Sequence, residues 1–435
     1  MSPFVTGLVG TALMFVLIFL RMPISFSMLI TGFLGILYLT NLEAALGSVA
    51  LTLYRTFSDY ALTVVPLFVL MGALANVSGI SDETFQVAEK WLRRLPGGLA
   101  MATIAGCAAF ASICGSNIAT VATLGSVALP EMKKAHYADS LATGSVAAGG
   151  TLGFLIPPSI GFVIYAILTE QSVGKLLIAG FFPGLLLAVL WMGTIIVMVR
   201  LNPSLAPVSS LARVSWKERL WALRNVWPVI LVFILVMGGI YLGMVTPTEA
   251  GAVGAVGLFL IALSKRRLTF YHFFDSLKET SRVTIMLFLI IAGALIFSYF
   301  LALAQVPTVL LGWIGGLEVS RYVILAIIIF IYLLLGCIMD AGAMLILTMP
   351  IVYPIIRTCG FDPIWFGVIC VIMMNAAMIT PPVGIAVYVT TGIAKDVPMS
   401  TIFRGALPFL IAMVLVSAIV TALPQVALFL PNLMK

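Results

Sequence analysis

The sequence predicts an all-α polytopic membrane protein made of two inverted-topology repeats. Of its 435 residues, 62% are hydrophobic and 9% are charged, whereas a soluble domain carries about 25% charged residues. Polar, glycine-containing segments near residues 115 and 336, and Pro-Pro pairs near 157 and 381, interrupt the apolar runs. Irregular backbone is tolerated at membrane depth only inside protein or beside a wet cavity. Each repeat is therefore expected to contain a re-entrant helical hairpin and a helix broken at its Pro-Pro pair.

The order of apolar runs and basic linkers indicates the topology. At about 20 residues per span, there is room for about ten to twelve crossings and some shorter pieces. Basic linkers mark the cytoplasmic side, as at Arg21, Lys133, Arg200 and Lys265. The first 20 residues lack a basic start and a cleavage site, so we expect a first span and not a removed signal. The expected segments are, in order, 4–20, 24–39, 41–59 (interfacial), 61–80, 81–96 (surface), 99–113, 121–130, 141–156, 161–168, 176–199, 226–244, 249–263, 285–304, 309–317, 322–335, 344–356, 364–379, 384–393 and 403–422.

Two stretches are expected to enter and leave the membrane on one side. The first hairpin lies between basic linkers and opens to the cytoplasm, with residues 115–120 as its polar tip; the second opens to the outside. The expected division is N-terminal scaffold helices 1–60, a first repeat 61–200 with hairpin 1 at about 99–130 and a broken helix at about 141–168, a linker and scaffold helix pair 201–280, and a second repeat 281–425 with hairpin 2 at about 322–356 and a broken helix at about 364–393.

The two halves align by a nearly constant offset in residue number. Gly115 aligns with Gly336 at an offset of 221, and Pro130 aligns with Pro350 at an offset of 220. The two Pro-Pro pairs align at an offset of 224. Paired interruptions at corresponding places in two halves indicate the binding site of a secondary transporter, near the membrane midplane between the repeats.

Other classes of protein fit the residues less well. The formal charge of +7 lies mostly in loops, which argues against a nucleic-acid partner. The five cysteines form no Cys-x-x-Cys pair, and His136 and His272 lie outside the expected spans, so neither disulfides nor a soft-ligand metal site is implied. An intramembrane protease would need a second acid facing Asp340, or a histidine inside a span. A passive channel would not need a hairpin repeated twice.

The first interruption has the chemistry of a sodium site. Sodium is a hard cation and binds oxygen, and a helix broken by proline leaves carbonyl groups without donors. The hairpin tip would supply polar groups of Ser116, Asn117 and Thr120. The broken helix would supply carbonyls freed at Gly153, Ile156, Pro157 and Pro158. The alternative is that Gly-Ser turns and proline kinks only allow close helix packing.

Two acids near the expected interruptions have different interpretations. Asp340 lies near the tip of hairpin 2, and an acid inside the membrane is by default a functional hypothesis, here a cation ligand or a proton site. A helix-capping role is the alternative. Glu249 follows Thr246-Pro247-Thr248, a pattern that favours an N-terminal helix cap.

At these motifs the chain resembles the large membrane subunit of tripartite ATP-independent periplasmic (TRAP) transporters, the DctM-like family. The matching segments are Gly115-Ser116-Asn117-Ile118-Ala119-Thr120, Leu152-Gly153-Phe154-Leu155-Ile156-Pro157-Pro158-Ser159, Thr246-Pro247-Thr248-Glu249-Ala250 and Thr380-Pro381-Pro382. The resemblance covers essentially the whole chain. Cys114 departs from it, because the family often has serine there.

The resemblance implies a sodium-driven secondary transporter with an elevator-type fold in the bacterial inner membrane, and no enzyme activity. It implies two or more sodium sites and no organic cofactor. The expected partners are a small four-helix membrane subunit (DctQ-like), a periplasmic substrate-binding protein (DctP-like) that delivers an organic acid such as a dicarboxylate or sialic acid, and membrane lipid. A stand-alone sodium/dicarboxylate symporter of the same superfamily is the alternative.

The resemblance also implies site residues. By residue match, the first sodium site is expected at Gly115, Ser116, Asn117, Gly153, Ile156 and Pro158. By the repeat, the second is expected at Gly336, Asp340, Gly342, Thr380 and Pro382. The expected substrate-binding residues are Ser116, Thr120, Ser159, Asp340 and Thr380.

Overall fold

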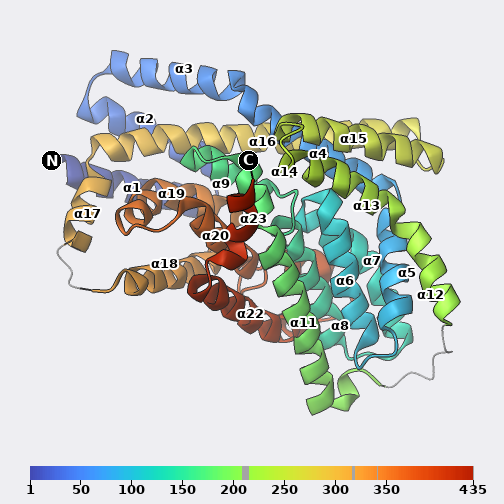
Figure 1. The fold of residues 1–435 in the computed structure, drawn as a ribbon. Coiled ribbons are helices and arrows are strands. Elements are labelled where there is room, and N and C mark those ends of the chain that lie inside the picture. Colours follow the sequence, from blue (N-terminus) through green and yellow to red (C-terminus); the bar gives the residue numbers. More distant parts are fainter. Residues whose placement is uncertain (208–214, 316–318, 340, 435) are drawn as a thin grey trace.

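The computed structural model describes residues 1–207, 215–315, 319–339 and 341–434, and every regular element among them is helical (Figure 1). The first half consists of α1 (Pro3–Phe19), α2 (Ile24–Leu39), α3 (Leu42–Ser58), η1 (Tyr60–Thr63), α4 (Val64–Val77), α5 (Ile80–Leu92), α6 (Gly98–Cys114), α7 (Asn117–Lys134), α8 (Asp139–Gly150), η2 (Thr151–Phe154), α9 (Ile160–Thr169), α10 (Val173–Ala179) and α11 (Phe181–Leu201).

The linker and the second half follow in the same order. They consist of η3 (Pro203–Leu205), α12 (Trp216–Ala222), η4 (Leu223–Val226), α13 (Trp227–Phe233), the π-helix η5 (Ile234–Gly238), α14 (Gly239–Tyr241), α15 (Pro247–Ser264), α16 (Phe270–Leu303), α17 (Val306–Gly315), α18 (Arg321–Gly336), α19 (Ala341–Thr358), α20 (Pro363–Ala377), α21 (Ile385–Ile393), α22 (Met399–Ala422) and α23 (Gln425–Leu433).

The all-helical membrane fold is confirmed, with some differences in the elements. Helix α7 begins at Asn117, so the expected polar turn 115–120 is shorter. Helix α16 extends over 34 residues and begins at Phe270, well before the expected span 285–304. Helix α12 lies within the expected linker, and α23 follows the last expected segment, 403–422. The expected span 176–199 is divided between α10 and α11 at Gly180.

Several helices have the length and composition of membrane spans. Seven described segments qualify: Tyr60–Val77, Val173–Leu201, Trp216–Tyr241, Pro247–Ser264, Phe270–Leu303, Ala341–Thr358 and Met399–Ala422. Shorter apolar helices accompany them, including the first limb of hairpin 1 and the helix α20 that precedes the second Pro-Pro pair. Many of the outward side chains are large and apolar, as expected for a surface that meets lipid.

The repeat is visible in how the helices pack. At the offset found in the sequence, α2 corresponds to α15 and α4 to the second half of α16. Helix α2 packs against α16, and its counterpart α15 packs against α4 (Figure 1). Gly72 in α4 and Gly293 in α16 are also equivalent, and both allow close approach of a neighbouring backbone. A Cβ at Gly72 would lie 2.3 Å from the Cys114 carbonyl oxygen, and one at Gly293 would lie 2.5 Å from that of Ser25.

Two equivalent contacts join each hairpin to the broken helix of the other repeat. Lys133, at the end of α7, donates a hydrogen bond to Asp396, which follows α21. Gln171, which follows α9, donates to the Tyr353 hydroxyl in α19 at 2.9 Å. Positions 133 and 353 are equivalent at an offset of 220, and positions 171 and 396 at an offset of 225, so the contacts correspond. The bond from Lys133 lowers the pKa of the Asp396 carboxyl, which is exposed in a loop.

Candidate functional site

The tip of hairpin 1 is a two-residue turn between α6 and α7. Gly115 ends α6 with a φ of +65°, a left-handed conformation that glycine adopts without strain. Ser116 caps α7, where its Oγ accepts from the Ala119 N–H at 3.4 Å. The Thr120 Oγ1 donates to the Ser116 carbonyl at 2.7 Å. The tip therefore presents the amide of Asn117 and the hydroxyl of Ser116 next to its own backbone.

The first broken helix packs directly on this tip. A Cβ at Gly153, in η2, would lie 2.7 Å from the Ser116 carbonyl oxygen. A Cβ at Gly115 would lie 2.7 Å from the Pro158 carbonyl oxygen. Only glycine fits at these two positions, and the result is that the backbone oxygens of Ser116 and Pro158 lie at the same junction.

Two residues of the predicted set have side chains that are engaged elsewhere, although at Ile156 the predicted ligand is the backbone carbonyl. The Ile156 side chain packs against Gly184 in α11, where a Cβ would lie 2.7 Å from Ile156 Cγ1. The Ser159 hydroxyl caps α9 by accepting from the Phe162 N–H at 3.3 Å, and it donates to the Phe154 carbonyl. The structure thus brings together Gly115, Ser116, Asn117, Gly153 and Pro158.

A residue that the sequence analysis did not select completes the junction. Asn375, near the end of α20 in the second repeat, accepts a hydrogen bond from Asn117 Nδ2 at 3.3 Å. Asn117 Nδ2 also contacts the sulfur of Met378. Asn117 is 2% exposed and Asn375 is fully buried, yet Asn117 Oδ1 and Asn375 Nδ2 have no hydrogen-bond partner. A buried polar atom without a partner is costly, so both atoms indicate places for a ligand. In the sequence, Asn375 is marked only as a single amide side chain in an otherwise apolar helix.

The second repeat repeats the packing but not the chemistry. A Cβ at Gly336, the end of α18, would lie 2.6 Å from the Ala377 Cβ at the end of α20. The Thr380 Oγ1 donates to the Ala376 carbonyl at 2.7 Å, and Gly342 lies in the first turn of α19. Asp340 lies outside the described residues. Among the residues that are described, no group of three or more His, Cys, Asp or Glu side chains is placed to hold a metal.

The two Pro-Pro breaks differ in exposure. Both contain a cis bond, at Pro157-Pro158 and at Pro381-Pro382. The first pair is buried, whereas Pro381 and Pro382 are exposed. Only the first break is therefore enclosed by protein, and the second faces a surface of the molecule.

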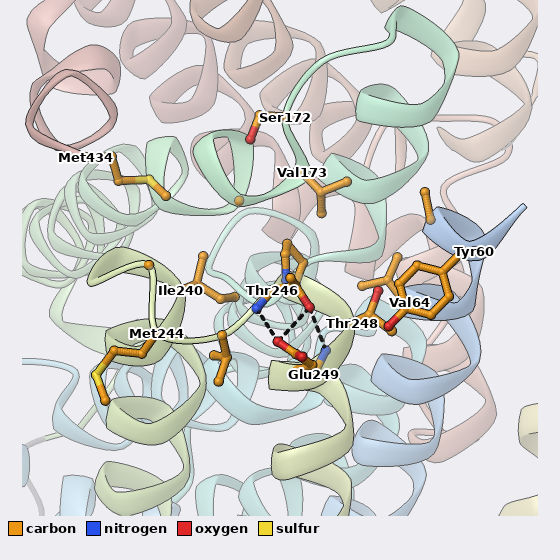
Figure 2. Close-up of a pocket in the computed structure, with 15 residues that line it drawn as sticks. Tyr60, Val64, Ser172, Val173, Ile240, Met244, Thr246, Thr248, Glu249 and Met434 are labelled. Carbon is orange, nitrogen blue, oxygen red and sulfur yellow. Dashed lines mark hydrogen bonds between the residues drawn. The ribbon is translucent and has the colours of Figure 1, made fainter.

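A separate hollow lies at the N-terminus of α15, away from the hairpin tips. It has a volume of about 520 Å³, and its lining includes Tyr60, Ser172, Met244, Thr248 and Met434 (Figure 2). Glu249 points back to Thr246, accepting from its N–H at 2.8 Å and from its Oγ1 at 3.0 Å. The Glu249 N–H in turn bonds Thr246 Oγ1 at 3.3 Å, so the two form a capping box. The predicted capping role of Glu249 is confirmed.

Comparison with known families agrees with this architecture. Residues 11–426 match the model of the family described as "Tripartite ATP-independent periplasmic transporter, DctM component". The C4-dicarboxylate TRAP transporter large permease protein DctM of Pseudomonas aeruginosa is 38% identical over 386 residues, which cover 88% of this chain and 89% of that protein. The sialic acid TRAP transporter large permease protein SiaM of Vibrio cholerae is 32% identical over 418 residues, covering 96% of each chain.

A solved structure shares the fold. The YdaH transporter of Alcanivorax borkumensis superposes with a TM-score of 0.61 at 16% identity, over 87% of this chain and 89% of that one. Its identity is too low to carry more than the fold. The family match and the apolar helices together identify the chain as a member of the DctM component family of tripartite ATP-independent periplasmic transporters, a multi-pass protein of the bacterial inner membrane.

Proposed function

We propose that this chain is the large permease of a sodium-coupled transporter that imports an organic acid, with one sodium bound where hairpin 1 meets both broken helices. The observation that carries the proposal is the buried, unpartnered Oδ1 of Asn117. It lies at a junction that also contains the backbone carbonyls of Pro158 and of Ser116, the second of which already accepts from Thr120 N–H and Oγ1. Neutral oxygens that converge in a water-poor place are suitable ligands for a small hard cation.

The asparagine pair also offers a role for the substrate. Two facing primary amides can share one hydrogen bond, which leaves one carbonyl oxygen and one NH₂ group for other partners. In this pair the free groups are Asn117 Oδ1 and Asn375 Nδ2. An oxygen suits the cation and an N–H suits a carboxylate, so we propose that the pair binds sodium through Asn117 and the substrate through Asn375.

Hydrogen bonds already made restrict which hydroxyls can bind an acid. The hydroxyl protons of Thr120, Ser159 and Thr380 are donated to backbone carbonyls. These groups retain only lone pairs, which repel a carboxylate and attract a cation. Ser116, whose Oγ accepts one bond, keeps its proton for a substrate oxygen. We therefore propose Ser116 and Asn375 as the principal carboxylate donors, and keep Asp340 as a predicted ligand of a second cation.

The proposed transport cycle is an elevator movement in a tripartite assembly. Hairpins and broken helices, linked across the repeats by the Lys133–Asp396 and Gln171–Tyr353 contacts, would move as one body. Helices α2, α4, α15 and α16, which pack on one another, would form the stationary scaffold. The family description supports a periplasmic binding protein and a small membrane subunit as partners. A stand-alone symporter would have the same site and no need for them.

The test is uptake of labelled succinate and of labelled sialic acid into proteoliposomes, with and without an inward sodium gradient and both candidate partners. The matched variants are Asn117→Ala in the junction and Asn202→Ala, an exposed amide in the linker. We expect sodium-dependent uptake that requires both partners, with a higher sodium requirement only in Asn117→Ala. Uptake that ignores sodium would refute the cation site. Uptake by the chain alone would establish the symporter.

A further inference from the structure

The linker between the halves contains a tryptophan-rich helix that packs against the end of a surface helix. Trp91 in α5 donates its Nε1–H to the Arg219 carbonyl in α12 at 3.2 Å, and its ring meets that of Trp216 edge-on at 6.3 Å (the two helices lie side by side in Figure 1). Lys265 and Arg267, in a basic linker of the kind that marks the cytoplasmic side, form ion pairs with the first turn of α5.

The apolar segment that contains α12 is longer than the hydrocarbon core is thick, which puts α12 at the level of the lipid headgroups. The apolar segment Trp216–Tyr241 has 26 residues, whereas about 20 cross the hydrocarbon core. The excess at its N-terminal end is α12, on the cytoplasmic side by the positive-inside rule. The side chains of Trp216, Leu220 and Trp221 are 67%, 60% and 64% exposed. Exposed tryptophan next to leucine is typical of the membrane–water interface.

A basic cavity opens beside these side chains. Its volume is about 740 Å³, and it is lined by Glu89, Lys90, Arg93, Lys217, Glu218 and Trp221. Both carboxylates are already engaged, because Glu89 accepts from Arg93 at 3.1 Å and Glu218 accepts from the Ser215 N–H at 2.9 Å. The ammonium groups of Lys90 and Lys217 make no ion pair with any described residue.

Two arginines at this contact also have buried nitrogens without an acceptor. Arg219 is 7% exposed, and its Nε and Nη2 have no hydrogen-bond partner; its charge rests on the Trp216 ring at 5.2 Å. The Nε of Arg93, which lines the cavity, is likewise buried without a partner. Four cationic side chains (Lys90, Arg93, Lys217 and Arg219) thus share the region with two carboxylates (Glu89 and Glu218), and an anion would balance the positive charge that remains.

We infer that this cavity is a binding site for the phosphate headgroup of an anionic phospholipid of the cytoplasmic leaflet. Lys90, Lys217 and Arg93 would contact the phosphate, with Arg219 adding to the field behind them. The exposed apolar side chains of α12 would lie along the acyl chains, which a free anion does not possess. Basic clusters beside membrane-spanning helices bind anionic lipids in this way.

The experiment is a native mass-spectrometry titration of the purified chain in detergent. The probes are dioctanoyl phosphatidylglycerol, dioctanoyl phosphatidylcholine and inorganic phosphate. The variants are Lys90→Gln/Lys217→Gln, Trp221→Ala, and the matched control Lys175→Gln/Lys278→Gln, two exposed lysines away from the cavity. Equal melting midpoints of the wild type and the variants are the control for correct folding.

We expect phosphatidylglycerol to saturate one site, with affinity reduced about 30-fold in Lys90→Gln/Lys217→Gln, at about fivefold for each lysine near the surface. The control should stay within about twofold, and Trp221→Ala should weaken the lipid but not phosphate. Equal binding of phosphatidylcholine, or an equal loss in the control, would overturn the site. Displacement of the lipid by equimolar phosphate, with no effect of Trp221→Ala, would overturn its assignment to lipid.

Discussion

Asn117 and Asn375 come from opposite repeats and are 258 residues apart in the chain, yet their amides touch at 3.3 Å. No equivalent pair is possible in the other repeat, because the positions that correspond to them are Ile338 and Thr151. The asymmetry gives the permease one amide-lined junction and one that depends on other groups.

At the residue scale, we predict that the asparagines act as a unit in sodium binding. Asn117→Ala should weaken sodium activation of uptake by about tenfold, the value of about one lost ligand bond, and Asn375→Ala should also weaken it, because Asn375 accepts the hydrogen bond that holds the Asn117 amide. The fold-loss of sodium activation in the double variant should be smaller than the product of the two single fold-losses, because contacting residues couple by about 0.5–3 kcal/mol. The measurement is the sodium concentration for half-maximal uptake in all four proteins. Strictly multiplicative effects would contradict the shared junction.

The sequence could predict only part of this junction. Ser116, Asn117 and the Pro-Pro break stand out because polar or proline residues interrupt apolar runs. Asn375 does not, because one amide in a 15-residue apolar helix has no local partner that reveals its role. Its significance depends on a contact across the repeats, which a reading along the chain does not contain. The inward packing of Ile156 was equally invisible, because it depends on Gly184 in another helix.

At the scale of the element, hairpin 1 depends on how closely its tip approaches the broken helix. Gly115 combines a φ of +65° with a contact in which a Cβ would lie 2.7 Å from the Pro158 carbonyl oxygen. Gly193, inside α11, is different, because a Cβ placed there would have no heavy atom of another residue within 4 Å. The same added methyl group is therefore free of contact at Gly193.

We predict opposite outcomes for the two glycines. Gly115→Ala should lower the melting midpoint and the sodium affinity, since the left-handed conformation alone costs about 1–2 kcal/mol. Gly193→Ala should be neutral or stabilising, because alanine favours helix by about 1 kcal/mol. Scanning fluorimetry in detergent, with and without sodium, tests both. A Gly115→Ala protein that melts like the wild type and keeps its sodium response would show that the tip is not tightly packed.

Elements with strong local signals were predictable, and elements that depend on their surroundings were not. The breaks at residues 157 and 381 follow from proline chemistry alone. The first half of α16 was missed because Asp275, Lys278, Glu279 and Arg282 make it too polar for a span, although it continues one helix of 34 residues. Helix α12 is only seven residues long, and although Ser215 and Glu218 form a capping box at its start, its packing against α5 cannot be seen along the chain.

At the scale of the whole molecule, the elevator proposal distinguishes contacts within a body from contacts between bodies. Lys133 and Asp396 both belong to the proposed moving body. We assign α10, which packs on α9 and α20, to the moving body and α14, which packs on α15, to the scaffold. A Cβ at Gly174 in α10 would be 3.2 Å from Ile240 Cγ2 in α14, so the proposed sliding interface passes between them.

We predict that a cross-link between the bodies stops transport and that one within the moving body does not. Gly174→Cys/Ile240→Cys, oxidised in a background without Cys337 and Cys359, should abolish uptake, and reduction should restore it. Lys133→Cys/Asp396→Cys, treated identically, should retain uptake. The readout is uptake before and after reduction, with cross-linking followed by gel mobility. Full uptake in the oxidised Gly174→Cys/Ile240→Cys protein would exclude movement at this interface.

A contact between the repeats can form only after both of its residues have been synthesised. Lys133 meets a partner 263 residues further along the chain. At about 5–20 residues per second, that partner emerges about 13 to 50 s later. Hairpin 1 is therefore without the Lys133–Asp396 contact during this interval. The first half of the chain therefore gains its last contacts only after the second broken helix has been synthesised.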